Sequence, residues 1–497
     1  MSMIDVSDLT FGYEGSPELI FDHVSFQIDT NWKLGFTGRN GRGKTTFLRL
    51  LQGKYPYSGT ISASVAFEYF PYEVADLSRT GLEIVGEIAP EAEDWEVQRE
   101  LGLLDLAEEA LERPFERLSN GERTKVLLAA MFLKENAFLL IDEPTNHLDL
   151  EGRRKLGSYL ARKRGFLLVS HDRAFLDQCV DHILAINRAN IEIQRGNFSS
   201  WWENRQRQDA FELARQEKLQ RDIGRLTESA RRTSGWSDRT EKSKFGVDKT
   251  GAKAADRGFV GHKAAKLMQR SKSIQRRREE AVEEKRQLLQ NLERQEALAV
   301  TPLPCRAGTR LAEFRNVAVY YDGRTVCRDI SFEILAGERI ALQGGNGCGK
   351  SSLLKLLLGE DIPHSGTVET MSGLVISYVS QSTDHLRGSL TDFAREQGLD
   401  GSRFRTILRK LDFPREQFAR NLEDYSSGQK KKVLLAASLC AQAHLYVWDE
   451  PLNFIDVISR MQVEELLLAY RPTLLFVEHD ARFCQEIATR RIQVTRA

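Results

Sequence analysis

The chain has 497 residues, of which 41% are hydrophobic and 29% are charged. This composition is typical of a globular protein with room for about three domains, and it excludes a collagen-like or mostly disordered chain. Its 71 Lys and Arg residues balance its 71 Asp and Glu residues, which excludes a uniformly basic nucleic-acid binder but not a local concentration of charge.

The first residues carry Asp5 and Asp8 and contain no apolar run, so we expect no secretory signal in them. No apolar stretch approaches the length of about 18 residues that a membrane span needs. The six cysteines are scattered and form no C-x-x-C pair, so neither a zinc cluster nor a disulfide framework is indicated. We therefore expect a cytoplasmic protein with reduced thiols.

The first chemical motif is a glycine-rich loop, GRNGRGKT, at residues 38–45. An apolar stretch typical of a strand (34–36) precedes it, and a helical pattern of leucines follows it. In such a loop, backbone N–H groups cradle phosphates, Lys44 would reach the β- and γ-phosphates, and the Thr45 hydroxyl would hold Mg²⁺. The alternative is an ordinary glycine-rich turn with a surface lysine.

Two further motifs follow in the same half of the chain. Ser119-Asn-Gly121 opens a helical pattern, where the serine could help to bind an anion or could be an ordinary N-cap. An apolar strand then ends in Asp142 and Glu143. The first carboxylate could hold Mg²⁺ and the second could orient or deprotonate water, whereas the alternative is a solvated acidic turn.

A histidine and a tyrosine are weaker candidates. His171 follows another apolar strand (166–169), where a lone histidine is more often structural but could contact a γ-phosphate. Tyr13 lies 31 residues before Lys44. It could stack on adenine, or it could be a half-buried aromatic side chain of a strand.

Residues 203–297 differ from the rest in charge, with 24 Lys and Arg against 16 Asp and Glu. Their apolar residues recur at helical and heptad spacing, which predicts two long helices, about 203–234 and 263–298, paired as an antiparallel coiled coil. Each helix would span about 45–55 Å. The loop between them, about 235–262, mixes basic and aromatic side chains. That mixture favours RNA binding over a solvated helical hairpin. The expected RNA-binding residues are Trp236, Lys242, Lys244, Phe245, Lys249, Lys253, Arg257, Phe259, Lys263, Lys266 and Arg270.

The second half of the chain repeats the first. A second loop, GGNGCGKS, occupies residues 344–351, and the other motifs recur as Ser426-Ser-Gly428, Asp449-Glu450 and His479. From lysine to serine the spacing is 75 and then 76 residues, and from serine to aspartate it is 23 in both halves. Chance does not explain two copies in register, so the functional interpretation of each motif is favoured. The sequence predicts two α/β nucleotide-binding domains, at 1–200 and 301–497, joined by a helical linker at 201–300.

Together these motifs resemble the ATP-binding cassette superfamily, most specifically at DEPTNHLD, residues 142–149. The resemblance implies ATPase activity and a head-to-tail pair of cassettes within one monomer. Each ATP would lie between one phosphate loop and the serine of the other half, so that Lys44 pairs with Ser426 and Lys350 with Ser119. It also implies a glutamine that contacts the metal, which is Gln381 in the second half, whereas Tyr72 stands at that place in the first.

The resulting site assignments are as follows. The catalytic candidates are Glu143, Glu450, His171 and His479, and the Mg²⁺ ligands are Thr45, Asp142, Ser351, Gln381 and Asp449. The ATP-binding candidates are Tyr13, Gly38, Asn40, Gly41, Gly43, Lys44, Thr45, Thr46, Ser119, Gly121, Tyr321, Gly344, Asn346, Gly347, Gly349, Lys350, Ser351, Ser352, Gln381, Ser426 and Gly428.

Two cassettes without a membrane segment resemble the ABC-F subfamily, whose members bind ribosomes. The segment GHKAAKLMQRSK (261–272), together with WKLG, RNGR and WDEPLN elsewhere, is similar to the Lsa-type antibiotic-resistance group. That group protects bacterial ribosomes against lincosamides, streptogramin A and pleuromutilins by inserting the linker through the tRNA exit site, where large-subunit rRNA and peptidyl-site tRNA are the contacts. The alternatives are a housekeeping ABC-F translation factor or the ATPase subunit of a transporter. The short segment between Lys44 and Ser119 leaves little room for the inserted arm of the housekeeping factors, and the basic linker argues against a transporter.

Overall fold

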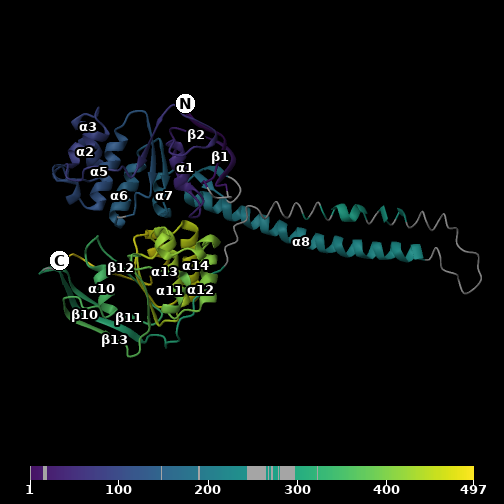
Figure 1. Cartoon of the computed structure of the whole chain (residues 1–497). Helices are drawn as coiled ribbons and strands as arrows, with labels where there is room; N and C mark the ends of the chain where they lie inside the picture. Colours follow the sequence, from purple (N-terminus) through teal and green to yellow (C-terminus); the bar gives the residue numbers. More distant parts are fainter. Residues whose placement is uncertain are drawn as a thin grey trace, which may run out of the picture. The chain divides into compact units, whose positions relative to one another are not determined.

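The computed structural model describes residues 2–14, 19–146, 148–187, 191–242, 297–321 and 323–496, with short helical pieces at 265–266, 268–269, 272–277, 279 and 282. The chain forms two compact units. One comprises Met1–Asn187, Ile191–Ser199 and Gln295–Ala497, and the other comprises Arg188–Asn190 and Ser200–Arg294. Both nucleotide-binding halves therefore belong to the first unit (Figure 1).

The N-terminal half contains two sheets. The smaller is antiparallel with the order β2-β1-β4, and the larger has the order β5-β6-β7-β3-β8-β9, in which only β9 is antiparallel to its neighbour. The strands are β1 (Met3–Phe11), β2 (Phe21–Asp29), β3 (Lys33–Thr37), β4 (Ser58–Ser62), β5 (Ala66–Phe70), β6 (Ala137–Asp142), β7 (Phe166–Val169), β8 (His182–Ile186) and β9 (Ile191–Arg195). The central strands are continuous apolar runs because both faces of the larger sheet are buried, one of them against β1, β2 and α1 (Lys44–Leu51).

The helices of this half begin at clear sequence signals. Ser119 and Glu122 form a capping box at the start of α5, as Thr80 and Glu83 do for α2. The helices are α1 (Lys44–Leu51), α2 (Gly81–Ile88), α3 (Asp94–Leu103), α4 (Glu109–Glu112), α5 (Asn120–Phe132), α6 (Leu150–Leu160) and α7 (Arg173–Cys179), with a 3₁₀ turn at Phe115–Arg117.

The C-terminal half repeats this plan. Its antiparallel sheet has the order β11-β10-β13, and its parallel sheet has the order β14-β15-β16-β12-β17. The strands are β10 (Arg310–Tyr321), β11 (Arg324–Leu335), β12 (Arg339–Gln343), β13 (His364–Thr370), β14 (Ile376–Val379), β15 (Leu445–Asp449), β16 (Leu474–Val477) and β17 (Arg490–Gln493). The helices are α10 (Lys350–Leu357), α11 (Leu390–Glu396), α12 (Gly401–Lys410), α13 (Ser427–Cys440), α14 (Val457–Tyr470) and α15 (Ala481–Ile487), with 3₁₀ turns at Arg415–Ala419 and Leu422–Asp424.

Strand β15 shows how the core holds the acidic end of the strand in place. All five of its residues are buried. Tyr446 and Trp448 pack into the core on one face of the sheet, and Leu445 and Val447 pack into the core on the other, as the two-residue period of a strand requires. Asp449 then stands at the carboxyl end, fixed by packing on both sides. The expectation of two tandem α/β cassettes is confirmed.

The helical segment differs from the expectation in its bounds. α8 runs from Phe198 to Lys242, 45 residues or about 68 Å, so residues 235–242 belong to a helix and not to the expected loop. An isolated glycine, such as Gly224 or Gly235 in α8, costs about 1 kcal/mol in a helix and does not end it when no proline follows. The pieces described between 265 and 282 are helical, whereas the rest of the second expected helix, and its pairing, lie outside the described residues. Among the described helices, none is long and apolar enough to cross a membrane.

Candidate functional site

Each phosphate loop connects a buried strand to a helix and depends on glycine at the turn. Gly43 and Gly349 have φ values of 91° and 93° directly before α1 and α10. A Cβ on Gly43 would lie 2.4 Å from Ile20 Cγ2, so both the left-handed backbone and the space require glycine. Several backbone N–H groups can therefore turn toward one point in front of the helix N-terminus, which suits a phosphate chain.

The two lysines curl over their own loops. Lys44 Nζ donates to the carbonyl oxygens of Gly38 at 2.7 Å and Arg39 at 3.1 Å. Lys350 Nζ does the same with Gly344 at 2.9 Å and Gly345 at 2.8 Å. Both lysines are buried, and burial lowers the pKa of Lys44. These carbonyl oxygens are neutral acceptors, whereas a phosphate bound in the loop would give each ammonium group a negatively charged partner.

The metal candidates lie beside the loops. Thr45 Oγ1 donates to Asp142 Oδ2 at 3.1 Å, and Ser351 donates to Asp449. Burial raises the pKa of both aspartates. Asp449 Oδ1 is buried and has no hydrogen-bond partner among the described residues. A buried, orphaned carboxylate oxygen beside a hydroxyl is a donor set that fits Mg²⁺.

The glutamates and histidines form matching pairs. Glu143 Oε1 lies 3.3 Å from His171 Nε2, and Glu450 Oε1 lies 3.4 Å from His479 Nε2. Both glutamates have left-handed backbones, with φ values of 50° and 47°, a strained conformation that is concentrated at functional sites.

The two glutamates nevertheless differ in acidity. Burial, together with the charge of Asp142, raises the pKa of Glu143 to about 8. Burial also acts to raise the pKa of Glu450, but hydrogen bonds from His479 and Gln381 outweigh it and bring the pKa to about 2. The surroundings therefore shift the pKa values of the two glutamates in opposite directions.

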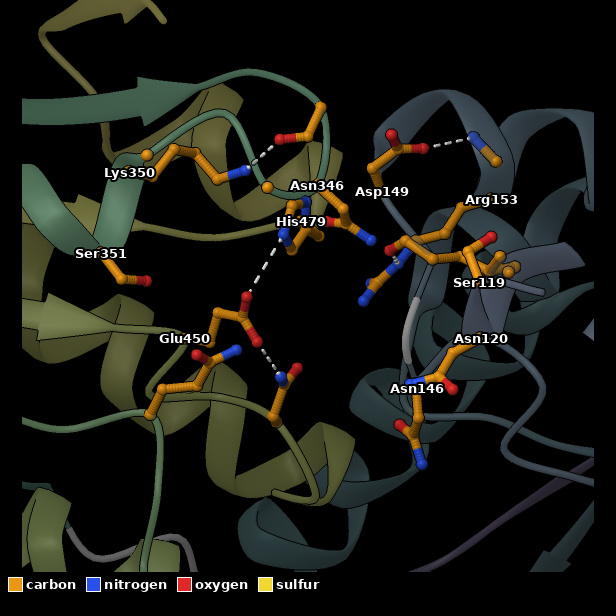
Figure 2. Close-up of a pocket in the computed structure, with 18 of the residues that line it drawn as sticks. Ser119, Asn120, Asn146, Asp149, Arg153, Asn346, Lys350, Ser351, Glu450 and His479 are labelled. Carbon is orange, nitrogen blue, oxygen red and sulfur yellow. Dashed lines mark hydrogen bonds and ion pairs between the residues drawn. The ribbon is translucent and has the colours of Figure 1, made fainter. Parts of the chain in front are cut away.

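A pocket of about 910 Å³ joins residues of both halves. Figure 2 shows Ser119, Asn120 and Arg153 on one wall, facing Lys350 and Glu450 on the other. Most candidates of the second phosphate loop line this pocket, namely Asn346, Gly347, Gly349, Lys350, Ser351 and Ser352, together with Tyr321, Gln381, Glu450, His479, Ser119 and Gly121. Residues more than 200 positions apart are thus brought to one cavity.

A smaller pocket of about 330 Å³ lies at the first phosphate loop. It is lined by the candidates Tyr13, Asn40, Gly41, Gly43, Lys44, Thr45, Thr46, Asp142, Glu143 and His171. Ser426 does not line it. The second half still approaches it, because Asn40 Nδ2 donates to Phe454 O at 2.8 Å.

The two tyrosine candidates occupy equivalent positions. Tyr13 OH bonds Thr46 Oγ1 at 2.8 Å, and Tyr321 OH bonds Ser352 Oγ at 3.1 Å. Their side chains are 45% and 43% exposed. Each hydroxyl is therefore tied to the helix after the phosphate loop while the ring still presents a face that could stack on a base.

Several site residues escaped the sequence analysis. Arg153 lines the larger pocket and bonds Asp172 Oδ2 through Nη1 at 3.1 Å, and Arg460 bonds Asp480 in the same way at 3.4 Å. The signal was present, since each arginine follows its metal-strand aspartate by 11 residues. Tyr69 was also missed, although its hydroxyl donates to Asp142 Oδ2 at 3.0 Å.

Of the expected RNA-binding residues, the structure describes few. Trp236 and Lys242 lie in α8, and Lys266 lies in a helical piece with its side chain exposed. The others fall outside the described residues: Lys244, Phe245, Lys249, Lys253, Arg257, Phe259, Lys263 and Arg270.

Comparisons with known proteins agree with this geometry. The family described as ABC transporter matches residues 21–146 and 327–453. Ribosome protection protein VmlR of Bacillus subtilis is 28% identical over an alignment that covers 97% of this chain and 85% of VmlR. ATP-binding protein Uup of Caulobacter vibrioides is 30% identical over an alignment that covers 95% of this chain and 74% of Uup. The solved complex of archaeal ribosomal stalk protein aP1 with the ribosome recycling factor aABCE1 matches 98% of this chain and 87% of its own at a TM-score of 0.64 and 18% identity, a likeness of fold alone.

Two matched cassettes, each with a phosphate loop, a paired carboxylate and a histidine, are the apparatus of ATP hydrolysis. The chain belongs to the ABC transporter family and, within it, to the ABC-F subfamily of ATPases.

Proposed function

We propose that this protein is an ATP-dependent ribosome-binding protein of the bacterial cytoplasm that protects the large subunit from antibiotics of the peptidyl transferase centre. The observation that carries the proposal is the similarity to ribosome protection protein VmlR over 97% of the chain. The drug classes follow the resemblance to the Lsa-type group, namely lincosamides, streptogramin A and pleuromutilins.

In this proposal the protein works as a monomer in which the two cassettes bind ATP between them. Lys350 and the adjacent loop N–H groups hold the phosphates on one side of the larger pocket, and Ser119 with the N-terminus of α5 completes the site from the other. Lys44 and Ser426 would form the second such site when ATP brings Ser426 up to the smaller pocket, which it does not line in this structure. Mg²⁺, held by Thr45 and Asp142 or by Ser351, Gln381 and Asp449, would neutralise charge on the β- and γ-phosphates.

Hydrolysis is assigned to the two glutamates. Glu143 and Glu450 each orient a water and accept its proton, while His171 and His479 hold the glutamate and contact the γ-phosphate. ATP keeps the cassettes together and the protein on the ribosome. Loss of the γ-phosphate removes contacts that bridge the halves, so hydrolysis permits release.

The basic linker is the part assigned to RNA. Its net charge of +8, from 24 basic and 16 acidic residues, attracts rRNA phosphates at the tRNA exit site, and its aromatic residues would stack on unpaired bases of rRNA or peptidyl-site tRNA.

The test is ribosome pelleting with the double variant Glu143→Gln, Glu450→Gln in ATP. We expect at least about tenfold more protein in the ribosome pellet than for the unmodified chain, because binding is kept and release is blocked. The matched control is Lys44→Ala, Lys350→Ala, which should stay in the supernatant. Equal recovery of both variants contradicts the proposal.

A drug footprint on the pelleted ribosomes separates the remaining alternatives. Loss of the lincomycin footprint supports protection. An intact footprint favours a housekeeping translation factor, whereas recovery of the protein with membranes instead of ribosomes favours a transporter subunit.

A further inference from the structure

We call Ser119-Asn-Gly121 and Ser426-Ser-Gly428 the signatures of the two cassettes, and the helices that they start, α5 and α13, the signature helices. The signature helix of the second cassette, α13, buries a lysine whose contacts lie at the hydrolytic site. Lys431 is only 2% exposed. Burial lowers the pKa of its ammonium group, while the carboxylates of Glu478, Asp449 and Glu450 act to raise it. A buried lysine is costly unless its donors are satisfied, so the contacts of this ammonium group identify what it holds.

All three contacts are carbonyl oxygens of the hydrolytic machinery. Lys431 Nζ donates to Ser380 O at 2.9 Å, to Glu450 O at 3.1 Å and to Asp449 O at 3.5 Å. Ser380 directly precedes Gln381, and Asp449 ends the strand that pairs with β14. The lysine therefore ties together the ends of two neighbouring strands, one leading to Gln381 and the other to the candidate base.

The geometry at Glu450 shows why such a tie matters. This residue has a φ of 47°, a left-handed conformation that a non-glycine residue keeps only when its surroundings hold it there. Its carboxylate also receives hydrogen bonds from Gln381 and from Asn453 Nδ2, the latter at 2.6 Å. Lys431 thus holds the backbone carbonyl of Glu450, while Gln381 and Asn453 orient its carboxylate.

The first cassette lacks both parts of this arrangement. The residue five positions after its signature serine is Thr124, and the Thr124 hydroxyl donates to Asn120 O within its own helix at 3.0 Å. Tyr72, in the place of Gln381, bonds Glu87 at 3.2 Å and does not line the smaller pocket. The carboxylate of Glu143 is held by His171 alone among the partners recorded for it: it accepts a hydrogen bond from the His171 backbone, and Oε1 lies 3.3 Å from His171 Nε2 without a hydrogen bond from any described residue.

We propose that Lys431 is a positioning residue that holds Gln381 and Glu450 ready for hydrolysis, so that the ATP site at Lys350 turns over faster than the site at Lys44. This inference rests on the proposed roles of the two glutamates. Lys431 acts through backbone groups and touches no substrate, so its effect falls on the rate of the chemical step and not on ATP affinity.

The experiment measures ATP turnover of the full chain in the Glu143→Gln background, where only the Glu450 site hydrolyses. We expect Lys431→Met, which keeps the length of the side chain but removes its donors, to lower kcat about tenfold and to change KM less than about twofold. Lys431→Gln, which keeps a donor, should retain more of kcat. Thr124→Val is the matched control at the equivalent position and should leave turnover unchanged. A kcat for Lys431→Met within twofold of its parent overturns the proposal.

A second comparison does not depend on how the Lys431 variants fold. The Glu143→Gln enzyme should hydrolyse ATP about tenfold faster than the Glu450→Gln enzyme, and equal rates overturn the inferred asymmetry. If neither enzyme exceeds the double glutamine variant, the proposed role of the glutamates fails instead.

Discussion

At the scale of single residues, the two signature glycines are equivalent in sequence but not in space. A Cβ on Gly428 would lie 2.6 Å from Phe454 O and 3.0 Å from Asn40 Nδ2, whereas a Cβ on Gly121 would meet only Leu148 Cδ2 at 3.2 Å. A backbone carbonyl cannot move aside as a leucine tip can. We expect Gly428→Ala to lower the free energy of unfolding by about 2 kcal/mol and Gly121→Ala by less than half of that, measured by denaturant unfolding. Equal losses would contradict the closer approach of backbone to Gly428 than to Gly121.

Candidate site residues could be found in the sequence where a motif repeats, and they were missed where burial decides. Lys44, Asp142 and Glu143 were selected because chemistry and duplication both mark them, and all three line the smaller pocket. Lys431 lies in a run of three lysines, which in sequence resembles a solvated helix face, and only packing reveals that its ammonium group is enclosed. Tyr69 was missed because a strand tyrosine gives no sign of which carboxylate its hydroxyl will meet.

At the scale of elements, Glu100 joins α3 to α6. It is 2% exposed, forms an ion pair with Lys163 and accepts a hydrogen bond from Tyr159 at 2.7 Å. Burial acts to raise the pKa of Glu100, but these partners outweigh it, so that the pKa is lower than in an unfolded chain. The stabilisation is therefore present above the ordinary glutamate pKa and is lost as the pH falls through the lowered one.

Accordingly, Glu100→Gln should cost about 2 kcal/mol of stability at pH 7, and the cost should shrink when unfolding is followed downward from about pH 5. Asp94→Asn, at an exposed position on the same helix, is the control and should cost little at any pH. A penalty for Glu100→Gln that does not change with pH would contradict the proposed charge pairing.

Element types were easier to predict than element ends. Caps such as Ser119 and strands such as 138–142 carry local signals. The continuation of α8 past residue 234 does not, because a glycine such as Gly235 neither stops nor permits a helix by itself and the outcome depends on the whole segment.

At the scale of the molecule, the cassettes share a buried ion pair. Arg173 on α7 contacts Glu464 on α14, with side-chain exposures of only 3% and 6%. Burial raises the pKa of Glu464 to about 7, although Arg173 opposes the rise. Each buried charge is therefore stabilised by its partner in place of water. We expect Arg173→Met and Glu464→Gln each to lower stability by about 3 kcal/mol, and the double variant to lower it by clearly less than the sum. Calorimetric unfolding of all four proteins measures this coupling, and additive losses would contradict it.

The duplicated architecture has a consequence for how the two sites can change. In a symmetric homodimer every substitution enters both active sites at once. Here each position exists once per molecule, so a tyrosine at 72 alters one site while a lysine at 431 alters only the other. Because the halves are joined in one chain, each site can change without the other. One site can therefore evolve a high rate of ATP hydrolysis while the other keeps a low rate.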